Sequence, residues 1–144
     1  MAKQDTKLES EGAEFLVLGN LLMQGIPAFK AYNYMKGYDI VALSKSLKYS
    51  LKIQVKSRWG TGAAHFLIKN IESNFIVLCR LNRGNKRGTR EKRPPEYFIF
   101  PKEMLEKVPK TEKWGKIMMK DIPKVENYQD NWSLIINHLE KLEK

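Results

Sequence analysis

The apolar run FIVLCRL at residues 75–81 is the feature that most constrains the fold. It contains a single charged side chain, and a strand this apolar is expected to lie deep in a sheet. Shorter strand patterns precede and follow it. They cover residues 39–43, 51–56, 66–68 and 96–100, and residues 45–49 form the expected turn between the first two.

Helical patterns occupy both ends of the chain. Thr6 and Glu9 have the spacing of a capping box at the start of a helix predicted over residues 6–25, whose apolar positions include Phe15, Leu18 and Leu22. Residues 101–108 suit a short helix with proline at its first position. The last helix is predicted over residues 132–142, and Asp130 is expected to cap it.

A helix, a run of strands and two further helices predict an α/β fold with a mixed β-sheet flanked by helices. The length of 144 residues suits a single domain, 1–144, and residues 1–6 are expected to be disordered. No stretch approaches about 18 consecutive apolar residues, and the N-terminal segment lacks the apolar core of a signal peptide. We therefore expect a cytoplasmic protein with no membrane segment.

Charge is the compositional property that points to a partner. The chain has 26 Lys and Arg against 16 Asp and Glu, a net charge of +10, which favours binding to a polyanion such as nucleic acid. Much of this charge lies in residues 80–93. We expect this segment to contact DNA phosphates as a mobile arm; the alternative is a solvated hairpin tip. Its candidate DNA-binding residues are Arg83, Lys86, Arg87, Arg90, Lys92 and Arg93.

The alternating strand at residues 51–56 carries a candidate site. Alternation places Gln54 and Lys56 on one face, and a hairpin with the preceding strand brings Asp39 beside Gln54. The carboxylate, the amide oxygen and the Val55 carbonyl are ligands that suit Mg²⁺. Lys56 is then suited to orient or deprotonate an attacking water and to balance charge on a phosphate.

Three segments carry a resemblance to a known superfamily. They are EFLVLGNLLMQG, which begins at Glu14, GYDIVA, which contains Asp39, and IQVKS, which contains Gln54 and Lys56. In this order they resemble the helix and the two strands of the PD-(D/E)XK nucleases, a superfamily that includes many restriction endonucleases and Holliday-junction resolvases. The resemblance also includes EYFIFP, a tryptophan like Trp114 and an Asn-Trp helix, and so spans nearly the whole chain.

This resemblance implies a restriction-endonuclease-like core and cleavage of DNA phosphodiester bonds with Mg²⁺ or Mn²⁺. It implies that Asp39 is the central metal ligand and that Gln54 and the Val55 carbonyl complete its shell. Glu14 then holds a second metal ion or its water, and Lys56 positions the nucleophile. Cutting both strands of a duplex needs two such sites, so a homodimer on duplex or branched DNA is expected.

The sequence departs from the family pattern at two positions and leaves alternatives open. Tyr38 replaces the proline, and Gln54 stands in the acid position, as in some homing endonucleases and in small bacterial and phage proteins of the superfamily. A neutral Gln54 is expected to hold Mg²⁺ more weakly. The alternative function is a catalytically inactive nucleic-acid-binding protein of the same fold; a more distant one is a basic interaction protein unrelated to nucleases. Glu11, one turn earlier, or neither glutamate is the alternative to Glu14.

Some single residues have less specific interpretations. Arg58 and Trp59 directly follow the candidate strand and are suited to hold a phosphate and to stack on a base, although Trp59 equally suits the core. The single cysteine, Cys79, is expected to be a small core residue. His65 and His138 have no acid or metal partner at a recognisable spacing, so ordinary structural positions are expected for both.

Overall fold

The computed structural model describes residues 6–32 and 35–144. Of residues 1–6, for which disorder is predicted, only Thr6 lies within the described residues. Thr6 itself is helical and begins α1. The helices are α1 (Thr6–Met23), α2 (Lys102–Glu106) and α3 (Ser133–Glu143), with two 3-10 turns, η1 (Met119–Asp121) and η2 (Val125–Tyr128). The strands are β1 (Ala28–Lys30), β2 (Ile40–Leu43), β3 (Ser50–Arg58), β4 (His65–Leu67), β5 (Phe75–Arg80), β6 (Glu96–Pro101) and β7 (Lys116–Met118).

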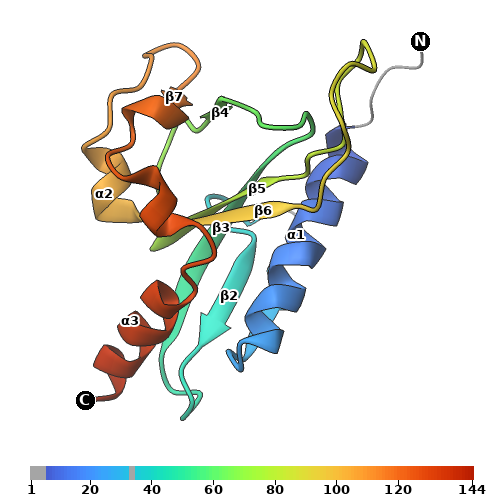
Figure 1. The fold of residues 1–144 in the computed structure, drawn as a ribbon. Helices are drawn as coiled ribbons and strands as arrows, with labels where there is room; N and C mark the ends of the chain where they lie inside the picture. Colours follow the sequence, from blue (N-terminus) through green and yellow to red (C-terminus); the bar gives the residue numbers. More distant parts are fainter. Residues whose placement is uncertain (1–5, 33–34) are drawn as a thin grey trace.

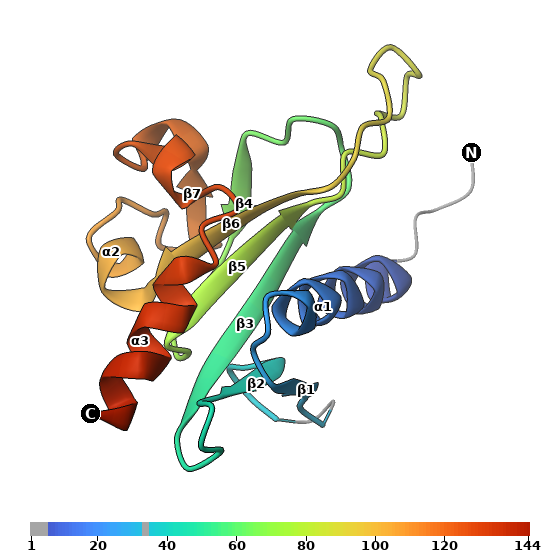
Figure 2. The same ribbon diagram turned by 60° about the horizontal axis from the view of Figure 1, so that its bottom comes forward.

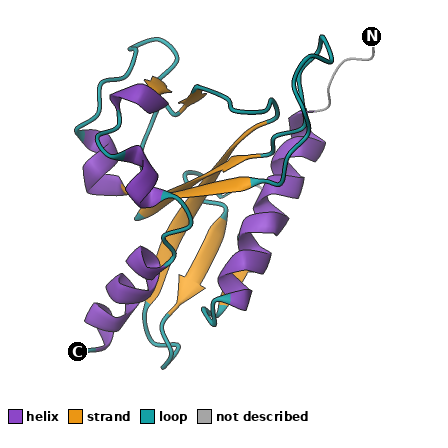
Figure 3. Ribbon diagram, in the orientation of Figure 1, coloured by secondary structure: helices purple, strands orange, loops and turns teal. Residues whose placement is uncertain are grey.

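A five-stranded sheet in the order β1-β2-β3-β5-β6 forms the centre of the structure (Figure 3). The pair β3 and β5 is parallel, whereas the other neighbours are antiparallel, so the sheet is mixed. Strands β4 and β7 form a separate antiparallel ribbon. The predicted mixed sheet flanked by helices is confirmed, and β5 lies inside it with Phe75 to Cys79 buried.

Two apolar clusters lie on the two faces of the sheet. Helices α1 and α3 cover one face, where Val17 and Ile135 pack with Ile53 and Val77. The other face is covered by α2, β4, β7 and η1, whose apolar side chains pack on Ile76 and its neighbours. Figure 1 shows α1 on the opposite side of the sheet from α2 and the β4–β7 ribbon. The molecule therefore has three layers, which bury β5 on both faces.

Several local predictions are corrected by the structure. In α1 the buried stripe is Ala13, Val17 and Leu21, whereas Phe15 and Leu22 are exposed. Pro101 precedes α2 as its N-cap instead of taking the first helical position.

Asp130 does not cap α3, because its backbone is left-handed (φ 52°) and Trp132 occupies the N-cap position. The short strands β1 and β7 were not predicted, since three residues carry too little periodicity to detect.

The expected core position of Cys79 is confirmed. Cys79 is fully buried, and burial raises the pKa of its thiol to about 12. Trp132 is also buried and packs against Tyr97, with 5.8 Å between ring centroids. None of the helices in the described ranges is both long and apolar enough to cross a membrane. The interpretation of residues 1–144 as a single domain stays a prediction.

Candidate functional site

The point where β2 and β3 separate is the centre of the site. The last register pair is Ile40 with Ile53, and β3 continues beyond it to Arg58 without β2 beside it. Asp39 lies directly before β2. Its backbone N–H donates to the Ile53 carbonyl at 2.8 Å, and its Oδ2 accepts the N–H of Val55, also at 2.8 Å. The carboxylate is thereby fixed at the open edge of β3.

The backbone of β3 presents an oxygen at the same edge. In an extended strand the N–H and C=O of one residue point to the same side. The carbonyls of Lys52 and Arg58 accept hydrogen bonds from Asn74 and Leu81, next to β5, so these even-numbered residues point toward that neighbour. Val55 points the other way, because its N–H donates to Asp39. Its carbonyl therefore faces the open edge beyond β2.

The side chains of β3 alternate as predicted. Leu51 and Ile53 are buried under α1 and α3, whereas Gln54 and Lys56 are partly exposed and lie in register with β5 residues whose side chains face the second cluster. Since Ile40 pairs with Ile53, the antiparallel register brings Asp39 beside Gln54. The Gln54 Oε1 atom is buried and has no hydrogen-bond partner among the described residues. Leaving such an oxygen unpaired is costly, which makes it a candidate ligand atom.

Helix α1 and strand β1 complete the site. Glu14 is largely buried, with 18% of its side chain exposed, and the Asp39 carboxylate acts electrostatically on it. Glu11 is more exposed and forms an ion pair with Lys30, whose ammonium also lies 3.6 Å from Glu14. Glu11 also acts electrostatically on Asp39, so both glutamates lie near that carboxylate, and the choice of Glu14 over Glu11 stays a prediction.

Lys30 was missed by the sequence analysis. It belongs to the undetected strand β1, which pairs with β2 so that Lys30 lies in register with Ile40. Lys30 belongs to no recognisable motif. It lies beside Glu11 and Glu14 of α1 because β1 pairs with β2. The weak signal available was the alternation of AFKA after the first helix.

Burial perturbs the ionisation of three predicted site residues. Desolvation raises the pKa of Glu14, and the nearby Asp39 carboxylate raises it further, against the effect of Lys30. Desolvation also raises the pKa of Asp39, although the Val55 N–H and Lys56 oppose it. The pKa of Lys56 is lowered by burial, against the attraction of Asp39. Such shifts concentrated in one place are typical of functional sites.

A metal ion at this position would need donors of mixed type. Within residues 6–32 and 35–144, no group of three or more His, Cys, Asp and Glu side chains is arranged to hold a metal. The candidate oxygen donors are the Asp39 and Glu14 carboxylates, the unpaired Gln54 Oε1 and the Val55 carbonyl. Hard divalent cations accept amide and backbone oxygens alongside carboxylates, so this donor set fits Mg²⁺ or Mn²⁺.

The basic segment between β5 and β6 is a protruding arm. Figure 2 shows it extending beyond the sheet, away from α2 and α3. Arg83 and Lys92 pair across it in an antiparallel bridge. The six basic side chains of the arm that are predicted to bind DNA are all exposed, and among the described residues none of them forms an ion pair. Arg80 differs, because it lies in β5 and pairs with Glu96 at 2.9 Å.

The base of the arm is anchored to the loop that follows β3. The hydroxyl of buried Thr61 accepts the Gly84 N–H at 2.8 Å and donates to the Glu91 carbonyl. The Thr61 N–H donates to the Gly84 carbonyl, and the Thr61 carbonyl accepts a hydrogen bond from the Arg90 guanidinium. Buried Asn82 accepts the Gly62 N–H and donates to the Pro94 carbonyl. The arm is therefore anchored at its base, and its expected mobility stays a prediction.

The residues at the end of β3 lie next to the base of the arm, because the Arg58 and Trp59 carbonyls accept the N–H groups of Leu81 and Arg83. The Arg58 guanidinium donates to the His65 carbonyl at 2.8 Å, which fixes its direction. Trp59 is half-buried and lines a shallow groove with Leu8, Leu16 and Leu81, so it is neither free nor fully in the core.

The residues left without a specific role have structural contacts. His138 packs edge-on against Phe75, as expected of an ordinary histidine. Trp114 is 58% exposed, and the ammonium groups of Lys69 and Lys113 lie within 6 Å of its ring centroid.

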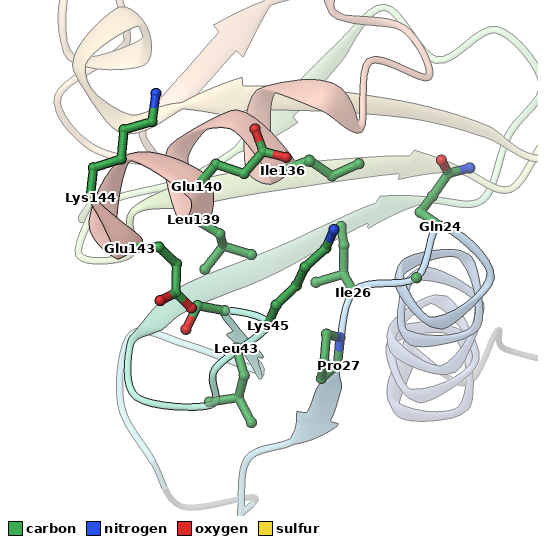
Figure 4. A pocket seen from close by; sticks show the side chains of 12 residues that line it. Gln24, Ile26, Pro27, Leu43, Lys45, Ile136, Leu139, Glu140, Glu143 and Lys144 are labelled. Carbon is green, nitrogen blue, oxygen red and sulfur yellow. The ribbon is translucent and has the colours of Figure 1, made fainter.

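A separate cavity of about 440 Å³ lies between the end of α1, the end of β2 and α3 (Figure 4). Ile26, Leu43 and Leu139 line it, with Lys45 and Glu140 at its rim. None of the predicted site residues lines this cavity. Its position therefore assigns it no part in the candidate site.

No protein-family model matches the chain, and no curated protein matches it in sequence. Among solved structures, the chain is similar to a bacterial homing endonuclease, I-Ssp6803I, with a TM-score of 0.64 and 19% sequence identity. The similarity covers 96% of this chain and 98% of that chain. At this identity the likeness concerns the fold. The chain thus has a mixed α/β fold similar to that of a homing endonuclease, with a five-stranded mixed sheet flanked by helices.

Proposed function

We propose that this protein is a metal-dependent DNA endonuclease of the PD-(D/E)XK type. The observation that supports this most is the convergence of Glu14, Asp39 and Lys56, all with perturbed pKa values, around the open edge of β3. The similarity of fold to a homing endonuclease agrees with it. The neutral Gln54 takes the place of the usual acid.

The oxygen donors named above hold Mg²⁺ or Mn²⁺ in this proposal. Asp39 is the central ligand, because Val55 fixes its carboxylate at the edge of the strand. Gln54 contributes its unpaired Oε1, and Glu14 approaches from α1. A bound divalent cation supplies electrostatic stabilisation of the negative charge that develops on the scissile phosphate.

Lys56 handles the proton of the attacking water. Burial lowers the pKa of Lys56, so its Nζ is available as a base more often than that of an exposed lysine. The water oxygen bonds to phosphorus, its proton passes to Nζ, and the phosphorus–oxygen bond to the leaving sugar breaks. The leaving oxygen takes a proton from solvent, which balances the hydrolysis.

DNA is bound by the arm and by the residues at the end of β3. The six exposed basic side chains of the arm contact phosphates, which gives affinity without sequence selection. Arg58 and Trp59 extend this surface toward Lys56. Two protomers are needed to cut both strands of a duplex, and we propose a homodimer on that ground.

A second candidate function is DNA binding without cleavage. Gln54 favours it, because a neutral amide in the acid position removes one negative charge from the metal site. The two functions predict the same arm contacts and differ only in the chemistry at Asp39 and Lys56.

The test is a cleavage assay on supercoiled, linear and branched DNA with Mg²⁺ or Mn²⁺. Wild type is compared with Asp39→Asn and Lys56→Met, and with the surface controls Glu140→Gln and Lys141→Met in α3. We expect nicked or cut products from wild type and from both controls, and none from the two site variants. Cleavage that survives in both site variants refutes the site. Salt-sensitive binding with no cleavage supports the second function.

A further inference from the structure

Lys30 is unusually enclosed for a lysine. Only 16% of its side chain is exposed, and its ammonium forms an ion pair with Glu11 and lies 3.6 Å from Glu14. The same ammonium sits 4.1 Å from the centre of the Phe15 ring. Strand β1, paired with β2, holds the Lys30 backbone beside Ile40. The ammonium is therefore fixed where the acidic side chains of α1 face Asp39.

The charges around the open edge of β3 nearly cancel. In their ionised forms, three carboxylates, from Glu11, Glu14 and Asp39, face two ammonium groups, from Lys30 and Lys56. One net negative charge remains. Binding of a divalent cation changes the net charge of the site from one negative to one positive charge. Binding of a phosphodiester, which has one negative charge, then makes the site neutral. Without Lys30 the same site would carry two negative charges and would be neutralised by the cation alone.

We propose that Lys30 is an internal counter-cation of this site, which weakens divalent-metal binding to the DNA-free protein and makes metal and DNA bind cooperatively. The inference rests on the proposed function, because it assumes that Glu14 and Asp39 hold the metal. Lys30 is a positioning residue, since it acts on the metal through the carboxylates that it contacts. The interaction energy between two charges at this distance is much larger in a partly desolvated site than in bulk water.

The test measures Mn²⁺ binding to the DNA-free protein by isothermal titration calorimetry. Wild type is compared with Lys30→Met, with Lys30→Arg, which keeps the charge, and with Lys141→Met, which removes an exposed lysine in α3. Circular dichroism and thermal unfolding confirm that each variant is folded. We expect Lys30→Met to bind Mn²⁺ about tenfold more tightly than wild type, and the other two variants to resemble wild type.

A second titration includes a saturating short DNA duplex, checked for integrity on a gel. We expect DNA to tighten Mn²⁺ binding about tenfold in wild type and much less in Lys30→Met. Equal or weaker Mn²⁺ binding by folded Lys30→Met, while wild type binds the metal, overturns the counter-cation role alone. If neither protein takes up Mn²⁺ with or without DNA, the proposed metal-dependent function fails and the role of Lys30 fails with it.

Discussion

The Oδ2 atom of Asp39 accepts the backbone N–H of Val55 at 2.8 Å, at the point where β2 no longer accompanies β3. A side chain thereby supplies the acceptor that a neighbouring strand would otherwise provide, which avoids an orphaned N–H group. The other carboxylate oxygen is left for a ligand. The same contact therefore occurs where β2 ends and fixes the carboxylate that we propose as the central metal ligand at the edge of β3.

Asp39→Asn is expected to stabilise the protein while abolishing cleavage. Asparagine keeps an oxygen that can accept the Val55 N–H, and it removes a carboxylate whose pKa burial has raised. We expect the free energy of unfolding to rise by about 1 kcal/mol near neutral pH, measured by urea titration. Asp39→Ala, which loses the acceptor as well, is the control and is expected to destabilise. A lower stability of Asp39→Asn contradicts the prediction.

The stabilisation by Asp39→Asn is expected to depend on pH. Because the pKa of Asp39 is raised above its ordinary value of 3.8, the folded protein binds the proton more tightly than the unfolded chain. Wild-type stability contributed by this group is therefore lost as pH rises through the window above 3.8. The advantage of the variant should appear in that window and vanish below it. Urea titrations across this range measure it, and a constant difference would argue against a desolvated carboxylate.

Lys56→Arg separates charge from proton transfer. Arginine keeps the positive charge but does not deprotonate, whereas the pKa of Lys56 is lowered from its ordinary value of 10.5. Wild-type cleavage is expected to increase with pH below that value, and the variant should be slower by about a hundredfold or more, without this increase. Single-turnover rates at several pH values measure both effects. A variant with the wild-type pH profile would exclude Lys56 as the base.

Gln54→Glu should make stability depend on metal. The buried Oε1 of Gln54 has no hydrogen-bond partner among the described residues, so a carboxylate there would be desolvated without compensation. We expect a loss of about 1–3 kcal/mol in EDTA and recovery when Mg²⁺ is added. Thermal unfolding with and without Mg²⁺ measures this. Wild type is the control, and equal destabilisation in both conditions would show that Gln54 does not face a metal.

Thr61→Val tests the anchoring of the arm. Valine has a similar shape but loses the hydroxyl that contacts Gly84 and Glu91. Amide hydrogen exchange should become faster in the arm and remain unchanged in β5 and β6, and DNA should bind about tenfold more weakly. Thr61→Ser keeps the hydroxyl and serves as the matched control. An arm that exchanges equally in both variants would mean that Thr61 does not fix it.

Removing charge from the arm tip should change the salt dependence of DNA binding. Lys86 and Arg87 are exposed at the tip. In a plot of log affinity against log salt, Lys86→Gln combined with Arg87→Gln is expected to lower the slope by about one for each DNA phosphate that the variant no longer neutralises. Lys141→Gln in α3 is the control. An unchanged slope would indicate that the tip does not contact DNA and is a solvated hairpin, which is the alternative interpretation of its sequence.

The features that could be predicted from sequence are those that depend on local periodicity. Alternation in β3 correctly placed Gln54 and Lys56 on the face opposite Ile53. The run around Cys79 correctly predicted a strand that lies deep in the sheet. In both cases the side-chain pattern repeats over enough residues to distinguish the two faces of a strand.

The parts that could not be predicted depend on contacts between distant segments. Lys30 reaches the site only because a three-residue strand pairs with β2, and three residues carry no usable period. Thr61 anchors the arm through hydrogen bonds across two loops, which no local pattern indicates. In α1, tertiary packing selected Val17 and its neighbours over Phe15, because small side chains allow the helix to approach the sheet.

The burial of Cys79 has a practical consequence for following the arm in solution. The chain has a single cysteine, its side chain is inaccessible, and its thiol stays protonated well above neutral pH. Only thiolate reacts readily with maleimide or nitroxide reagents. A cysteine introduced at exposed Thr89 can therefore be labelled selectively in the otherwise natural sequence, and fluorescence or spin resonance can report the arm's position as DNA arrives.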